Sequence, residues 1–182
     1  MALAQAKLTA TQARIDTMSL PKSGWTTSAR SDAQARVMSM GLPARRDEYW
    51  KYTRPDALTS ADVIKAEALD EDDTSIFSDL ECILIVFEDG VYNAEKSDKI
   101  KEADLSLELL SEVNDLDIHW AVGLYGVIET TSQTPVDRPL AALNTAFARE
   151  GMLLHVKGAI TKPISIFYIQ NSGNSDVMLH HV

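Results

Sequence analysis

The chain has 182 residues, 45% of them hydrophobic, and a formal net charge of −10. These values are typical of a globular protein of one or two domains, and no apolar run is long enough to span a membrane. The acidic balance argues against nucleic-acid binding, and a single cysteine without a recognisable signal peptide indicates a cytoplasmic protein.

The N-terminal third of the chain is predicted to be helical. Pro21 and Gly24 are expected to end a first amphipathic helix. Its stripe at helical spacing consists of Ala4, Leu8, Thr11, Ile15 and Met18.

A polar break over residues 26–28 separates this helix from a second one. Ser31 and Gln34 have the spacing of a capping box, which predicts the start of that helix, and Gly41 suits its C-terminal end. Pro43 then favours a third, short helix over residues 44–53.

An acidic stretch, residues 67–73, is expected to be a linker because like charges repel one another. It divides the chain into a helical domain, residues 1–75, and a strand-rich region, residues 76–182. Net charge also changes along the chain, from +5 over residues 1–54 to −15 over residues 55–119. These charges either form solvated faces, or the basic part docks on a partner or on the acidic part of its own chain.

A buried strand is predicted where the hydrophobic period changes. Residues 82–87 form a continuous apolar run rich in β-branched side chains, which is typical of a strand covered on both faces. Asp89 and Gly90 follow as a strong hairpin signal.

Three further helices are expected in the middle of the chain. The first two cover residues 105–113 and 118–128, and Gly123 and Gly126 weaken the second. The third has Asp137 as its N-cap, with Pro139 in its first turn and Gly151 at its end.

The rest of the chain is predicted to form strands: Met152–Val156, Ile164–Ile169 and Val177–Val182. Leu153, Ile166 and Leu179 lie 13 residues apart, a spacing that fits stacked short strands in either a β-helix or a sandwich. The expected fold class is α+β, mostly β in its second half. Because the last strand has no turn or polar tail behind it, we expect a fragment whose open C-terminal strands self-associate.

The motifs of common catalytic and metal sites are not present. The sequence contains no Gly-rich phosphate loop, nucleophile elbow or paired Cys or His metal motif, so we expect no catalytic, cofactor or metal residue and no enzyme activity. His180 and His181 are adjacent on a predicted strand and should point to opposite faces, while His119 and His155 lie on other elements. Cys82 is expected to behave as a small core residue.

One segment combines aromatic and basic side chains, a composition typical of protein interfaces. Its candidate partner-contact or domain-packing residues are Arg45, Arg46, Tyr49, Trp50 and Tyr52. The aromatic rings either seal a small helical domain or contact a partner. Tyr49 and Trp50 are neighbours and cannot face the same way on a helix, so one of them should be available to something beyond that helix.

Two blocks of sequence resemble the SufB/SufD family of the Suf iron–sulfur cluster assembly machinery. The first block resembles the N-terminal signature of the SufD branch, which SufB generally does not share: Gly41-Leu42-Pro43, Arg46, Glu48 and Trp50-Lys51-Tyr52-Thr53. The second block resembles the family's entry from a helix into its β-helical core: Pro139-Leu140-Ala141-Ala142-Leu143-Asn144-Thr145-Ala146-Phe147, Gly151, Gly158, Lys162-Pro163-Ile164 and Ile166. The two blocks in the expected order make the match specific, and the first block favours SufD, in its N-terminal part.

The resemblance implies a helical domain followed by the beginning of a right-handed parallel β-helix. It also implies a non-catalytic scaffold subunit that pairs with a SufB-like subunit, with the iron–sulfur cluster on the assembled complex. A SufC-like ATPase would dock on a C-terminal helical domain that these residues do not include. The alternative function is a free-standing protein-binding module that uses the Arg45–Tyr52 surface.

Overall fold

The structure is a computed structural model that describes residues 2–22, 24–62, 79–101, 103–173 and 177–182. In these ranges the helices and strands form an α+β arrangement with two small sheets. None of the helices in these ranges is long and apolar enough to cross a membrane. The predicted linker at residues 67–73 lies outside the described residues.

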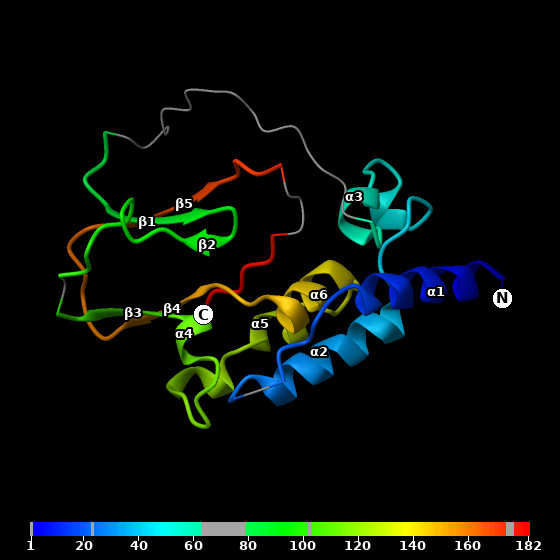
Figure 1. Cartoon of the computed structure of the whole chain (residues 1–182), viewed down its shortest axis with the longest axis horizontal. Helices are drawn as coiled ribbons and strands as arrows, with labels where there is room; N and C mark the ends of the chain where they lie inside the picture. The colour runs from blue at the N-terminus through cyan, green and yellow to red at the C-terminus, as the bar shows by residue number, and fades with distance from the viewer. Residues whose placement is uncertain (1, 23, 63–78, 102, 174–176) are drawn as a thin grey trace.

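Three helices form one layer of the molecule (Figure 1): α1 (Ala2–Asp16), α2 (Thr27–Met40) and α6 (Pro139–Phe147). The predicted stripe of the first helix is confirmed at Thr11 and Ile15, which are buried, although the helix ends at Asp16, before Pro21. The core between these helices consists of Ile15, Ala33, Val37, Leu42, Ala142, Leu143, Ala146 and Phe147. It joins residues from both sides of the predicted boundary at residue 75, and the boundary itself stays a prediction.

Helix α2 begins earlier than predicted, at Thr27. The capping box at Ser31 and Gln34 is therefore wrong, as is the polar break over residues 26–28. Tertiary contacts explain the earlier start. Trp25 is buried and donates its backbone N–H to the carbonyl of Leu116 (2.9 Å), so the chain enters the helix from a fixed position. Gly41 follows the helix as predicted, with φ of 68° and its N–H on the Val37 carbonyl.

The third predicted helix, over residues 44–53, is also wrong. Only a 3-10 turn, η1 (Glu48–Trp50), forms there, and a short helix, α3 (Asp56–Thr59), follows Pro55. Asp47 has an extended backbone, with φ of −68° and ψ of 140°, which interrupts a helix at that point, and its Oδ2 accepts the backbone N–H of Ala44.

The first sheet has the order β2-β1-β5: β1 (Ile83–Glu88), β2 (Val91–Tyr92) and β5 (Ile164–Ile169). The hairpin is confirmed, because β1 and β2 are antiparallel and Asp89 and Gly90 both have positive φ, at 48° and 82°. Strand β1 is largely buried, as its apolar run predicted. Its other edge pairs in parallel with β5.

The second sheet pairs β3 (Leu105–Leu109) with β4 (Met152–Val156) in antiparallel fashion. The predicted helix over residues 105–113 is therefore wrong, except for its last turn, α4 (Leu110–Val113). Leu105, Leu107 and Leu109 alternate with Ser106 and Glu108, a period of two that suits a strand.

The segment predicted as one helix over residues 118–128 is two short elements, η2 (Trp120–Gly123) and α5 (Val127–Thr131). Gly126 separates them with φ of 74°, a left-handed conformation that no right-handed helix contains. Helix α6 is capped at Arg138, not Asp137, and ends at Phe147, short of Gly151.

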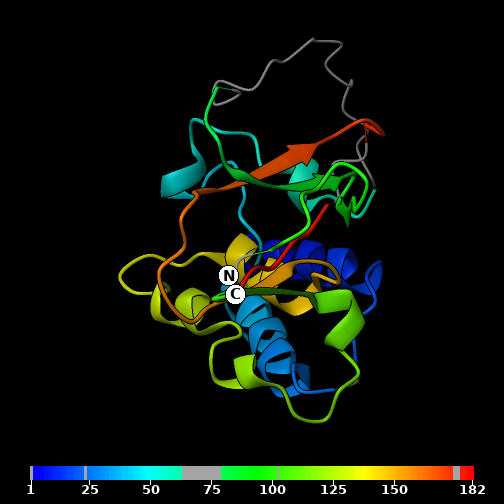
Figure 2. The same ribbon diagram turned by 90° about the vertical axis from the view of Figure 1, so that its left-hand side faces the viewer.

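The C-terminal residues run parallel to β4, between the upper sheet and the helical layer (Figure 2). His180 N–H donates to the Glu150 carbonyl (3.0 Å) and Val182 N–H to the Met152 carbonyl (3.0 Å). Within residues 177–182 only Leu179 forms a β-bridge, so the predicted strand Val177–Val182 is wrong as a regular strand, although its backbone bonds to residues 150–154. The two sheets share a small core of Ile85, Phe87 and Met152 with Leu107, Leu154, Ile164, Ile166 and Leu179 around it.

Candidate functional site

The segment that follows α2 is fixed to α1 at its first residues. Leu42 is buried and donates its backbone N–H to Thr11 Oγ1 (2.8 Å), and Thr11 in turn donates its hydroxyl to the Lys7 carbonyl (2.9 Å). A hydroxyl on the buried side of α1 therefore determines where the chain leaves α2. The residues after Leu42 extend from this attachment to the surface.

Asp47 organises the turn that carries the aromatic side chains. Its Oδ2 accepts a hydrogen bond from Lys7 Nζ (2.8 Å) and one from the backbone N–H of Ala44 (3.1 Å), and its carbonyl accepts the N–H of Trp50 (2.9 Å). Partial burial alone would raise the pKa of Asp47, but the hydrogen bonds from Lys7 and Ala44 leave it below the ordinary value. The carboxylate thus stays charged and holds the turn against α1.

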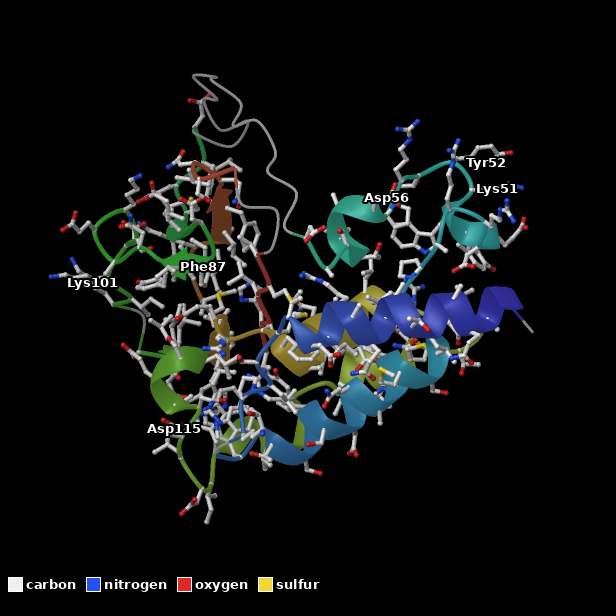
Figure 3. All side chains as sticks on the ribbon, turned by 45° about the vertical axis from the view of Figure 1, so that its right-hand side comes forward. Lys51, Tyr52, Asp56, Phe87, Lys101 and Asp115 are labelled. Carbon is white, nitrogen blue, oxygen red and sulfur yellow. The ribbon has the colours of Figure 1, made fainter. Side chains whose placement is uncertain are left out.

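The five predicted site residues lie on this turn and differ in exposure. Arg45 and Arg46 are exposed, and the side chains of Tyr49 and Tyr52 are 72% and 91% exposed. Trp50 is half-buried. Lys51 Nζ lies 5.1 Å from the centroid of the Tyr52 ring, and both side chains stand at the outer tip of the segment (Figure 3).

A hollow of about 310 Å³ lies beside the turn. Tyr49 and Trp50 line one side, and Pro135 and Val136 line another with Pro139, the first residue of α6. The remaining lining comes from Lys7, Met40, Gly41, Pro43, Asp47 and Asp137. The hollow thus brings together the two sequence blocks that resemble one family, although almost 90 positions separate Trp50 from Pro139.

The residues at this surface are of the kinds that are common at protein interfaces. Its charged pair, Lys7 and Asp47, is satisfied internally, and no nucleophile with a neighbouring base lies among its described residues. Exposed tyrosines beside arginines supply apolar area and hydrogen-bond donors at a low entropic cost. Prediction from sequence did not include Lys7, Pro135 and Val136, because nothing in their spacing indicates that they meet the aromatic turn.

The histidine side chains make contacts in different parts of the structure. The ring of His180 lies 4.1 Å from that of Tyr125, whereas His181 accepts the Met152 N–H at Nδ1 (3.0 Å) and has Tyr168 Oη 2.9 Å from its Nε2. The two side chains therefore face opposite sides, as predicted. Cys82 is half-buried and has no disulfide.

His119 is buried and stacks on Trp25, with 4.6 Å between the ring centroids. Its Nε2 lies 2.9 Å from Glu108 Oε2, which also accepts the indole N–H of Trp120 (2.8 Å). The Trp120 bond and the His119 contact lower the pKa of Glu108 despite some burial. Within the described ranges, no three His, Cys, Asp or Glu side chains gather closely enough to hold a metal ion.

Arg30 is a buried cation that sequence reasoning did not identify, since a lone arginine on a polar helix gives no such signal. Its side chain is fully buried, with Nε on Thr26 Oγ1 (2.8 Å) and Nη1 on the carbonyls of Ala146 (3.1 Å) and Ala148 (2.6 Å). A cation at the C-terminal end of α6 satisfies its last carbonyls and complements the helix dipole. Arg30 is therefore part of the packing between α2 and α6.

A comparison with known families finds a match that covers most of the chain. The model described as "SufBD protein N-terminal region" matches residues 9–166, which include both sequence blocks and most of the described elements. No curated protein matches the chain significantly.

Proposed function

This chain belongs to the SufB/SufD family of the iron–sulfur cluster assembly machinery, and on that premise we propose that it is a non-catalytic scaffold subunit of the SufD type. The observation that carries the proposal is the packing of the two family-like blocks into one unit. Helix α6, from the second block, packs on α2, and Leu42 of the first block belongs to the same core. The SufD assignment rests on the first block, Gly41 to Thr53, which resembles that branch.

The strand-rich part is, in this proposal, the beginning of a right-handed parallel β-helix. Two parallel pairings between segments distant in sequence support it: β1 with β5, and β4 with residues 179–182. Successive turns of a β-helix stack their strands in parallel in this way. A SufB-like subunit would pair with this region, as the resemblance implies.

The proposal places the iron–sulfur cluster on the assembled complex, in the cytoplasm, with no cofactor held by this chain alone. The SufC-like ATPase would contact a C-terminal helical domain, as the resemblance implies. The role of these residues is then to support the partner subunit that pairs with the β-region. They would contribute shape and stability and no reacting group.

A second candidate function is a protein-binding module that acts through Arg45, Arg46, Tyr49, Trp50 and Tyr52. The high exposure of Tyr49 and Tyr52 beside two exposed arginines favours it, because aromatic and arginine side chains carry much of the binding energy at protein interfaces. The two functions are compatible in one protein, but they predict different effects of mutation.

Mixing the purified chain with a SufB-like subunit tests the proposal by size-exclusion chromatography with light scattering. We expect a stoichiometric complex that the double variant Tyr49→Ser, Tyr52→Ser still forms, because pairing uses the strands. Loss of the complex in that variant would instead favour the aromatic turn as the contact. No complex at micromolar concentrations would refute the scaffold proposal.

A further inference from the structure

A short segment on the opposite side of the molecule from the aromatic turn exposes an unusual amount of apolar surface. Ile118 and Ile128 are 87% and 83% exposed, and five more large apolar side chains between and beside them are also open to solvent. The full set is Leu116, Ile118, Trp120, Val122, Leu124, Val127 and Ile128. We call it the 116–128 surface.

The inner side of this segment is firmly anchored, so the exposed side chains cannot turn inward. Ala121 and Tyr125 are buried against Trp25, Leu110 and Leu153. Tyr125 donates its hydroxyl to the Thr145 carbonyl (2.8 Å), and His119 Nδ1 accepts the Ala121 N–H (3.2 Å). Turning Ile118 or Ile128 inward would displace these contacts.

Several backbone N–H groups of the segment are hydrogen-bonded to carbonyls of the same segment. The N–H groups of Val122, Leu124 and Val127 donate to carbonyls three residues earlier, and that of Tyr125 to the Ala121 carbonyl. A partner therefore finds no free strand edge to extend. It would have to contact side chains, as a helix lying on an apolar surface does.

The sequence that carries the surface is acidic, and Arg36 and Arg138 contact it only at its α5 end, on Glu129 and Ser132. From residue 102 to residue 137 the sequence contains eight Asp or Glu residues and no Lys or Arg. Glu112, Asp115 and Asp117 are exposed directly before the apolar residues, and Figure 3 shows Asp115 at the end of the molecule away from Lys51 and Tyr52. Apolar area beside carboxylates is complementary to apolar area flanked by cations.

We propose that the 116–128 surface docks a basic amphipathic helix of a partner protein. The helix would place its apolar stripe on Ile118, Val122 and Ile128 and its Lys or Arg side chains near Glu112 and Asp117. A second copy of this chain fits poorly, since a two-fold contact through this surface would bring its own carboxylates together. An anionic membrane would be repelled for the same reason.

Fluorescence anisotropy with a labelled 18-residue peptide of Leu and Lys at helical spacing tests the proposal at physiological salt. We expect saturable binding, weakened at least about tenfold by the double variant Ile118→Gln, Ile128→Gln. That variant leaves the charge unchanged, so its effect separates this surface from attraction to acidic residues elsewhere. Glu112→Gln with Asp117→Asn should weaken binding less and reduce its salt dependence.

Gly123 offers a steric test, because a Cβ there would meet no atom within 4 Å. Gly123→Gln should fold normally and weaken binding, whereas Leu80→Gln, at another exposed apolar residue, should leave it unchanged. The proposal fails if all variants bind the peptide equally, or if the same peptide with Glu in place of Lys binds as tightly. Self-association abolished by the Ile118, Ile128 variant, or binding to anionic vesicles, would also overturn it.

Discussion

The imidazole of His180 lies against the phenol ring of Tyr125, with 4.1 Å between the ring centroids. This contact places the C-terminal segment over the buried cluster of Tyr125 and Arg30, whose guanidinium carbon is 5.1 Å from the Tyr125 centroid. Burial, followed by the charge of Arg30, lowers the pKa of His180 to about 4. Burial also raises the pKa of Tyr125 to about 12, so both rings are neutral at physiological pH.

The first prediction concerns the dependence of stability on pH. In the unfolded chain His180 takes up a proton near pH 6.5, whereas in the folded chain it does so only near pH 4. The stabilisation that depends on neutral His180 is therefore fully present above pH 6.5 and is lost as the pH falls toward 4. The loss should reach about 3 kcal/mol in the free energy of unfolding. His181, whose pKa burial also lowers, acts in the same direction. Urea unfolding at pH 7 and pH 4.5 measures the change.

The control is His180→Gln, which cannot titrate and keeps the backbone bond to Glu150. Its stability should fall less between the two pH values, and the difference from the parent isolates His180 from the carboxylates that titrate in the same range. Equal pH dependence in both proteins would contradict the assignment. Arg30, His181 and Glu129 are the charged or titratable groups that influence His180.

A second prediction concerns the ion pair between α2 and α5. Arg36 donates to both carboxylate oxygens of Glu129, which is buried, and Gln133 Nε2 donates to Glu129 Oε1. Arg36→Met would leave a buried carboxylate without its cation and should cost about 3 kcal/mol of stability. Chemical denaturation at pH 7 measures this cost.

The matched double variant Arg36→Met, Glu129→Gln removes both charges and keeps an amide beside Gln133. It should be more stable than Arg36→Met alone, because no buried charge then remains unpaired. A double variant less stable than Arg36→Met would contradict the prediction. The destabilisation by Arg36→Met would then come from the lost packing of the arginine side chain and not from the unpaired Glu129 carboxylate.

The third prediction concerns Gly151, which lies against the C-terminal segment. It has φ of 153°, and a Cβ there would lie 1.8 Å from the carbonyl oxygen of His180. Gly151→Ala should therefore displace residues 179–182 from β4 and speed exchange of the His180 and Val182 amide hydrogens. Hydrogen exchange measured by NMR detects this, and Gly123→Ala, in open space, is the control. Unchanged protection at Val182 would show that the segment adapts to the methyl group.

The aromatic turn gives a fourth prediction. Trp50 is half-buried, so Trp50→Ala should cost about 2 kcal/mol, less than the roughly 3–5 kcal/mol of a fully buried ring. Tyr52→Ala, at a ring almost fully exposed, should change stability by less than about 0.5 kcal/mol. Thermal melts of the two variants compare these costs, and equal effects would place Trp50 on the surface.

The elements that could be predicted from the sequence are those that a few neighbouring residues specify. Asp89 and Gly90 determine a hairpin by their own backbone preferences, and the apolar run at residues 83–87 can be satisfied only by burial on both faces. Strands β4 and β5 have their predicted bounds for a similar reason, since Gly151 and Pro163 delimit them. The family resemblance likewise depended on short contiguous blocks.

The elements that sequence reasoning missed depend on distant contacts. Residues 105–109 become a strand because β4 lies beside them, although their leucines also fit a helical pattern. Helix α2 starts at Thr27 because Trp25 is held by Leu116. The hollow at Trp50 could not be predicted either, since Lys7 and Pro135 reach it only through the packing of α1 and α6.

The parallel pairing of β1 with β5 has a consequence for biosynthesis. Ile83 pairs with Ile164, 81 positions later, so the ribosome needs about 4–16 s to supply the second strand. The hairpin with β2 can form at once, but the other edge of β1 stays open during this interval, and closing the loop costs about 4 kcal/mol of chain entropy. A nascent chain therefore offers an unpaired strand of Ile, Leu, Val and Phe to chaperones until β5 emerges.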